Sequence, residues 1–233
     1  MRKTFQLIAG AALLFSGSLL AQEFQEGQHF ARIGSPVATP DDRVVVTDGF
    51  GYPCGACRRF LPYISAWVEN APDYVEVEHL PIALQPGWDL FVRGYYTAQV
   101  MGIAEETHEA MFKAVHDERR QFRSFNDIAD FYAEHGVEAD SFLNTAQSFA
   151  VDARIRQNRN DVRTFGIRGT PAIIVQGKWR VSPNGFNSYD EMLAAVDYLV
   201  EREAEELGLG GQNEDDSEGE ETAEPEQADE ASS

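Results

Sequence analysis

The sequence predicts an α/β protein in which a block of helices interrupts a small β-sheet. Three observations lead to this prediction. Residues 44–80 have the pattern of a strand, a helix and a second strand, residues 88–165 show only helical periodicity, and residues 172–200 have the pattern of two short strands and a helix. The expected order is therefore β-α-β, a helical insertion, and β-β-α.

A buried strand followed by an amphipathic helix is predicted first. The run Val44-Val45-Val46 is β-branched and typical of a central strand buried on both faces, and the segment 49–53 is expected to end it. From Cys57 onward the apolar residues recur with helical spacing, which predicts a helix that carries Cys54 at its N-terminus. The apolar positions on that helix face are Phe60, Leu61, Ile64, Trp67 and Val68.

A second strand and the helical block follow. Residues 74–80 alternate around Val75 and Val77, which predicts a strand that Pro81 ends. From Trp88 to Phe165 the pattern indicates four or five helices. These helices are expected to be separated at Gly102, at Ser124 and at Gly136.

The last part of the fold is predicted to be a hairpin and a helix. Residues 172–175 and 179–182 indicate two short strands, joined by a turn at residues 176–178. Ser188 and Glu191 have the spacing of a capping box at a helix start. The helix then presents one apolar face, formed by Met192, Leu193, Val196, Leu199 and Val200.

The N-terminal residues have the pattern of an export signal. Arg2 and Lys3 precede an apolar run that is shorter than the roughly 20 residues needed to cross a bilayer, and Ala21 offers a cleavage site. A buried helix or a membrane anchor is the alternative. We expect residues 1–21 to be a signal peptide and the mature protein to be soluble in the periplasm, an oxidising compartment.

The C-terminal residues are strongly acidic. Residues 212–233 contain ten Asp or Glu and no Lys or Arg, which predicts a disordered tail. We expect it to solubilise the protein, and docking of a partner is the alternative. Residues 22–211 then form one domain, with the helical insertion at about residues 86–150. The net charge of −20 leaves this body acidic as well, which argues against nucleic acid and anionic membrane surfaces as partners.

The two cysteines of the chain, Cys54 and Cys57, form a CxxC pair at the predicted helix start. A zinc site needs two more ligands, and a structural disulfide over two intervening residues constrains the chain little. Redox catalysis is the favoured interpretation, and it needs no metal or organic cofactor because the two sulfurs hold the redox equivalents. The histidines, which a zinc site would need, are scattered: His29, His79, His108, His116 and His135.

The position of the pair assigns the two roles. Unpaired amides and the dipole at the helix N-terminus stabilise a thiolate, which lowers the pKa of Cys54 and makes it the nucleophile. Cys57 lies one turn further on, on the apolar face, and is expected to be shielded. It then attacks only a mixed disulfide held on Cys54 and so resolves it.

Two further residues are candidates for the site. Pro171 follows Thr170 and directly precedes the strand predicted at residues 172–175, where the missing N–H of a proline is tolerated. Sequence physics leaves both the trans and the cis peptide open here. Asp48 fits either a surface carboxylate or a buried proton acceptor beside Cys57.

These residues resemble the active-site and cis-proline segments of the DsbA-type thiol:disulfide interchange proteins of the thioredoxin superfamily. The resemblance rests on residues 48–57 (DGFGYPCGAC) and 165–179 (FGIRGTPAIIVQGKW), and extends more weakly over about residues 24–205. It implies a thioredoxin fold with an inserted all-helical domain. It also implies a cis Pro171 facing the cysteines, a Thr170 backbone that contacts extended substrates, and a match between Asp48 and the buried acidic residue of the family.

The resemblance also implies an activity. The Cys54-Cys57 disulfide would accept electrons from cysteine pairs of reduced or misoxidised exported proteins, and a DsbB-type membrane partner would reoxidise it. We expect a monomer. A reductase or isomerase on the same fold and a peptide-binding chaperone with a passive disulfide remain alternatives. A glutathione-dependent isomerase of the kappa type is disfavoured by the paired cysteines.

Gly55 and Ala56 depart from the family pattern. The best-known oxidants of the family carry Pro-His between the cysteines, and the histidine helps to stabilise the thiolate. Gly-Ala supplies neither a charge nor a side-chain donor, so we expect a less oxidising protein. Arg58 and Arg59 are expected to restore part of the positive field.

Overall fold

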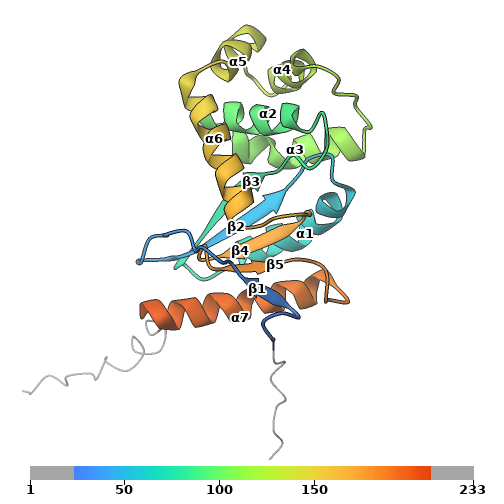
Figure 1. The fold of residues 1–233 in the computed structure, drawn as a ribbon. Helices are drawn as coiled ribbons and strands as arrows, with labels where there is room; N and C mark the ends of the chain where they lie inside the picture. Colours follow the sequence, from blue (N-terminus) through green and yellow to red (C-terminus); the bar gives the residue numbers. More distant parts are fainter. Residues whose placement is uncertain (1–23, 211–233) are drawn as a thin grey trace, which may run out of the picture.

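A computed structural model of the chain describes residues 24–210 (Figure 1). The predicted signal peptide at 1–21 and the predicted acidic tail at 212–233 lie outside the described residues. The described part folds into a five-stranded sheet and seven helices. In chain order they are β1 (Phe30–Arg32), β2 (Val44–Phe50), α1 (Gly55–Glu69), β3 (Val75–Pro81), α2 (Asp89–Val100), α3 (Ala104–His116), α4 (Phe125–Ala133), α5 (Ala139–Ala146), α6 (Phe149–Thr164), β4 (Ala172–Val175), β5 (Trp179–Val181) and α7 (Tyr189–Leu207).

The strands are arranged in the order β1-β5-β4-β2-β3. β2 runs parallel to β3 and antiparallel to β4, so the first β-α-β unit and the C-terminal hairpin share the central strand. The predicted order of elements is confirmed, with five helices α2–α6 between β3 and β4. β1 was not predicted, because its three residues are too few to show a periodic pattern.

The central strand is buried along its whole length, as predicted, but it is longer than predicted. Gly49 and Phe50 belong to β2, where Gly49 pairs with Leu80 on one side and with Ala172 on the other. A Cβ atom on Gly49 would lie 2.8 Å from the Ala172 carbonyl oxygen. Gly49 therefore serves close strand packing here, whereas the sequence suggested that it ends the strand.

Two apolar clusters cover the two faces of the sheet. α1 and α7 pack on one face, through Phe60 and Ile64 of α1 and a row of α7 residues that includes Met192 and Val196. The other face is covered by a smaller cluster that includes Phe165 and Ile174. Figure 1 shows α7 lying beneath the sheet and the helices α2–α5 grouped above it.

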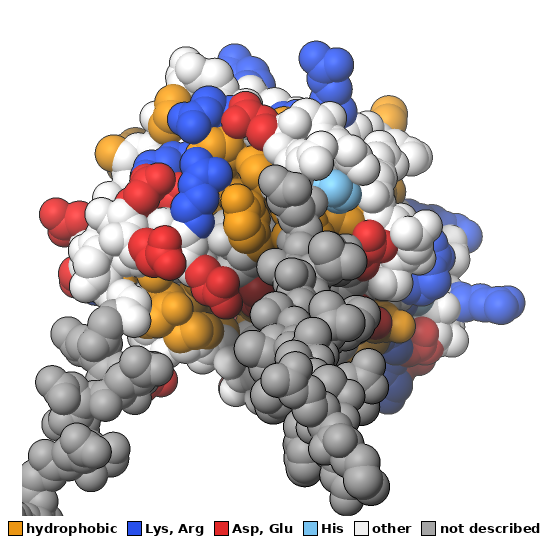
Figure 2. Space-filling view, turned by 90° about the horizontal axis from the view of Figure 1, so that it is seen from below, with side chains coloured by type: hydrophobic (Ala, Val, Ile, Leu, Met, Phe, Trp, Pro, Cys, Tyr) orange, Lys and Arg blue, Asp and Glu red, His pale blue; other side chains and the backbone are white. Residues whose placement is uncertain are grey.

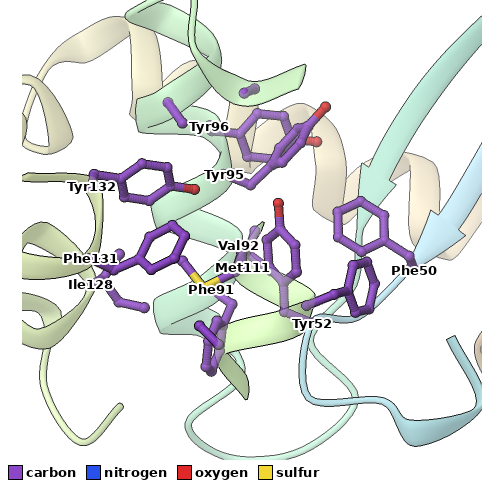
Figure 3. Close-up of a cluster of buried hydrophobic side chains, with 14 of the residues drawn as sticks. Phe50, Tyr52, Phe91, Val92, Tyr95, Tyr96, Met111, Ile128, Phe131 and Tyr132 are labelled. Atoms are coloured by element: carbon purple, nitrogen blue, oxygen red, sulfur yellow. The ribbon is translucent and has the colours of Figure 1, made fainter. Parts of the chain in front are cut away.

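A third cluster joins the inserted helices to the end of β2. Aromatic rings of α2 and α4 face Phe50 and Tyr52, the residues that lead from β2 to the cysteines (Figure 3). The same cluster contains Cys54, Cys57 and Leu61. The helical insertion therefore forms one wall of the region around the cysteine pair.

The outer surface is mixed in character. The face seen from below in Figure 2 shows basic, acidic and hydrophobic side chains interspersed over its visible part. Within residues 24–210, no helix combines the length and the apolar character that crossing a bilayer requires.

Candidate active site

The two cysteines lie at the N-terminus of α1, as predicted. Cys54 is the N-cap residue, and its sulfur accepts a hydrogen bond from the Cys57 amide at 3.2 Å. Both are free thiols in this structure. Cys57 is 3% exposed and Cys54 9%, so the more accessible sulfur is the one at the helix tip.

The surroundings separate the acidities of the two thiols. A hydrogen bond from Cys57, helped by the nearby Thr170 and by the amides of Cys57 and Ala56, lowers the pKa of Cys54 to about 5, against the opposing effect of burial. The bond to Cys54, together with burial, raises the pKa of Cys57 far above that of a free thiol. At neutral pH the pair therefore holds one thiolate, on Cys54, and one proton, on Cys57.

The segment before β4 lies against this pair. The Thr170–Pro171 peptide bond is cis, which decides the question that the sequence left open. The Cys54 sulfur lies 3.5 Å from the Thr170 carbonyl oxygen, to which the thiol form donates. Cys57 and Pro171 line one small enclosed space together with Asp48.

Asp48 is buried, which excludes the surface carboxylate that was one of its two interpretations. Its residue exposure is 3%, and its Oδ2 lies 3.6 Å from Nδ1 of His79, its partner across the β2–β3 ladder. Its Oδ1 is buried without a hydrogen-bond partner. A buried carboxylate with one unpartnered oxygen, in the space that also borders Cys57, is suited to accept a proton.

The residues between the cysteines are held by neighbouring side chains. The Arg59 guanidinium lies over Gly55, 3.7 Å from the position that a Cβ atom would take. The Tyr189 hydroxyl of α7 donates to the Ala56 carbonyl at 3.2 Å. A Cβ atom at position 55 would make an ordinary van der Waals contact with this guanidinium.

Arg58 does not supply the positive field expected of it. Its guanidinium donates to both carboxylate oxygens of Asp117, at 3.3 and 2.6 Å. The neighbouring negative charge cancels most of its field, so of the two arginines only Arg59 remains as a source of positive charge.

The sequence analysis missed the residues on the far side of Asp48. His79 of β3, Glu105 and His108 of α3 and Tyr52 form a polar group that begins at Asp48 and ends at the surface. One signal was available, because the alternation of β3 places His79 on the same inward face as Val75 and Val77. Its contact with α3 depends on how the insertion docks, which no local pattern shows.

A fold and a site of this kind place the chain among the thiol:disulfide oxidoreductases of the thioredoxin fold. Comparison with known proteins narrows this class. The family model described as the DSBA-like thioredoxin domain matches residues 50–197, more than half of the chain, and the chain belongs to this family.

The alignments with similar proteins cover most of this chain and most of each relative. The chain is 33% identical to a thiol:disulfide interchange protein DsbA of Pseudomonas syringae over 83% of this chain and 91% of the relative. It is 30% identical to the DsbA of Pseudomonas aeruginosa over 82% and 92%. A crystal structure of Pseudomonas aeruginosa DsbA superposes with a TM-score of 0.75 at 28% identity, over 81% of this chain and 98% of that one.

A second solved structure, the oxidoreductase DsbA from Xylella fastidiosa, superposes with a TM-score of 0.73 at 30% identity, over 78% of this chain and 98% of that one. The predicted fold class, a thioredoxin fold with an inserted all-helical domain, is confirmed by these neighbours. The chain is a thiol:disulfide oxidoreductase, as its sequence predicted.

Proposed function

We propose that this protein introduces disulfides into exported proteins through the Cys54-Cys57 pair. A substrate thiolate attacks the Cys54 sulfur of the oxidised pair, and Cys57 leaves. A second substrate thiolate then attacks the substrate sulfur of the mixed disulfide, so Cys54 leaves as a thiolate and the substrate carries the new disulfide. The observation that carries this proposal is the position of Cys54 at the N-cap of α1, where its sulfur accepts from the Cys57 amide. This position lowers the pKa of Cys54 and makes it a good leaving group.

The other site residues support these two steps. In this proposal the Thr170 backbone pairs with an extended substrate, and Pro171 holds it beside the cysteines. Asp48 exchanges a proton with Cys57 as that sulfur leaves or attacks. Gly55 and Ala56 set the redox potential because neither side chain stabilises the Cys54 thiolate. Its stabilisation then depends on backbone donors and on Arg59.

Location and partners follow from the same proposal. An enzyme that forms disulfides needs an oxidising compartment, so we place it in the periplasm after removal of residues 1–21. Its substrates are reduced or misoxidised exported proteins, which it oxidises as a monomer. A membrane partner of the DsbB type would take electrons from the reduced pair.

The reduction potential tests the direction of the reaction. Thioredoxin combines a nucleophile pKa of about 7 with a potential of about −270 mV, and DsbA combines about 3.5 with about −120 mV. A Cys54 pKa of about 5 places this protein between them, so we expect a potential between these two values. Equilibration with glutathione at pH 7, read by separating the oxidised and reduced forms, measures it.

The same preparation tests catalysis. Each oxidised protein molecule should convert one molecule of a peptide with two thiols to the peptide disulfide. A potential at or below that of thioredoxin, with no peptide oxidation, would favour the reductase alternative. Activity that persists after alkylation of both cysteines would favour the peptide-binding chaperone.

A further inference from the structure

The buried acid behind the cysteines is connected to the surface through the inserted helices. His79 lies between two carboxylates, with Nδ1 3.6 Å from Asp48 Oδ2 and Nε2 3.5 Å from Glu105 Oε2. The three exposures form a gradient, since the side chain of Asp48 is 4% exposed, that of His79 16% and that of Glu105 78%. One imidazole therefore bridges a buried carboxylate and a solvated one.

We propose that His79 is a positioning residue in a relay that couples the protonation of Asp48 to proton release at Glu105, and so connects the buried Cys57 thiol to solvent. The proposal rests on the function proposed above, because it matters only if Cys57 gains and loses a proton during exchange. It adds an exchange of one proton with solvent at Glu105, on α3 of the insertion, for each proton that Cys57 loses or gains.

The charges around His79 suit this role. Burial lowers the pKa of His79, but the facing carboxylates of Asp48 and Glu105 outweigh it and raise the pKa to about 9. Glu105 has a lowered pKa, first because of its contact with His79. At neutral pH the ring therefore carries two N–H groups, and each nitrogen lies within ion-pair distance of one carboxylate.

A second histidine provides a neutral support. His108 stacks on His79 with ring centroids 4.5 Å apart, and its Nδ1 lies 3.2 Å from the Tyr52 hydroxyl. Burial, and then the charge on His79, lower the pKa of His108 to about 3, so it stays neutral. Tyr95 of α2, the remaining titratable group beside this pair, is kept neutral because burial raises its pKa.

The proton transfers balance without another reactant. When Cys57 attacks a mixed disulfide on Cys54, the new sulfur–sulfur bond forms, the bound sulfur leaves with the electron pair of the old bond, and Asp48 takes the Cys57 proton. Asp48 is then neutral and no longer stabilises the positive charge of His79, so His79 releases its Nε2 proton to Glu105 and keeps the proton on Nδ1. In the opposite direction, Asp48 gives its proton to the leaving Cys57, and His79 takes up a proton on Nε2 from Glu105.

The reaction of the reduced protein with 5,5′-dithiobis(2-nitrobenzoate) separates the two cysteines. Release of the first nitrothiobenzoate reports attack by Cys54, and release of the second reports attack by Cys57. We expect His79→Gln to leave the first phase unchanged and to slow the second roughly 100-fold at pH 7. The loss should shrink as the pH rises to 9, where hydroxide removes the Cys57 proton, and imidazole should restore the second phase of His79→Ala.

Two variants on α3 provide a test that does not disturb the core. Glu105→Gln should slow the second phase several-fold, and Glu106→Gln, an exposed neighbour on the same helix, should not change it. The relay would be overturned if His79→Gln slowed the second phase by the same factor at every pH. It would also be overturned if the second phase were unchanged in both His79→Gln and Glu105→Gln. Loss of the first phase in the unmodified protein would instead refute the role of Cys54, and the relay with it.

Discussion

Replacing Cys54 with alanine should reduce peptide oxidation to the uncatalysed rate. Replacing Cys57 should have the same effect on the rate, but this variant should accumulate a mixed disulfide on Cys54. Without Cys54 the protein lacks the sulfur at the helix tip, which alone combines access with a lowered pKa. Without Cys57 the remaining thiolate still reacts, but a mixed disulfide on Cys54 has no neighbouring thiol to resolve it.

The two variants can be told apart by what they capture. Cys57→Ala incubated with glutathione disulfide should gain one glutathione by mass, whereas Cys54→Ala should gain none at neutral pH, because the Cys57 pKa is raised. Equal capture by both variants would contradict the assigned roles. The circular dichroism of each variant provides the control for folding.

Replacing Glu203 with alanine should lower the free energy of unfolding by about 3 kcal/mol, the low end of the cost of breaking a buried ion pair. Glu203 of α7 is fully buried, and its carboxylate accepts from the Trp179 indole at 2.6 Å and from the Lys178 ammonium. The variant leaves the Trp179 N–H without this acceptor. Lys178 keeps Glu206 and is partly exposed, which limits the loss.

Urea unfolding of three variants and the unmodified protein tests this anchor between α7 and β5. Glu205→Ala, an exposed neighbour, should change the free energy of unfolding by less than about 0.5 kcal/mol. Glu203→Gln, which keeps an acceptor for Trp179, should fall between the other two variants. A similar cost for Glu203→Ala and Glu205→Ala would show that the buried carboxylate does not anchor the helix.

Much of the fold could be predicted because its elements carry local signals. The spacing from Cys57 to Ile64 indicates α1, and the Gln176-Gly177 turn indicates the hairpin, where both residues have positive φ. The cysteine roles also follow from local position, since the helix tip alone distinguishes Cys54 from Cys57. The strand at Gly49 was misjudged because the close approach of Ala172 comes from a distant part of the chain.

The polar surroundings of the site were the part that local patterns missed. Arg58 looks like a free cation in the sequence, and its partner Asp117 lies 59 positions away. Asp48 was ambiguous for the same reason, because its burial depends on His79 and on the docking of α3. Tertiary packing determines which charged residues pair when they are far apart in the sequence. A residue pattern alone therefore does not predict these pairs.

The acidity of Cys54 is the quantity on which the mechanism depends. Its pKa is lower in the folded reduced protein than in an unfolded chain, so the reduced form gains stability that is complete above the unfolded thiol pKa of about 8.5. That gain should decline as the pH falls toward 5 and be lost below it.

The most direct measurement is the ultraviolet thiolate absorbance of the reduced protein from pH 3 to pH 9, with Cys54→Ala as the blank. We expect one thiolate to appear with a midpoint near pH 5, and no second one below pH 9. A midpoint near 8.5, the pKa of a free cysteine, would contradict the proposed mechanism.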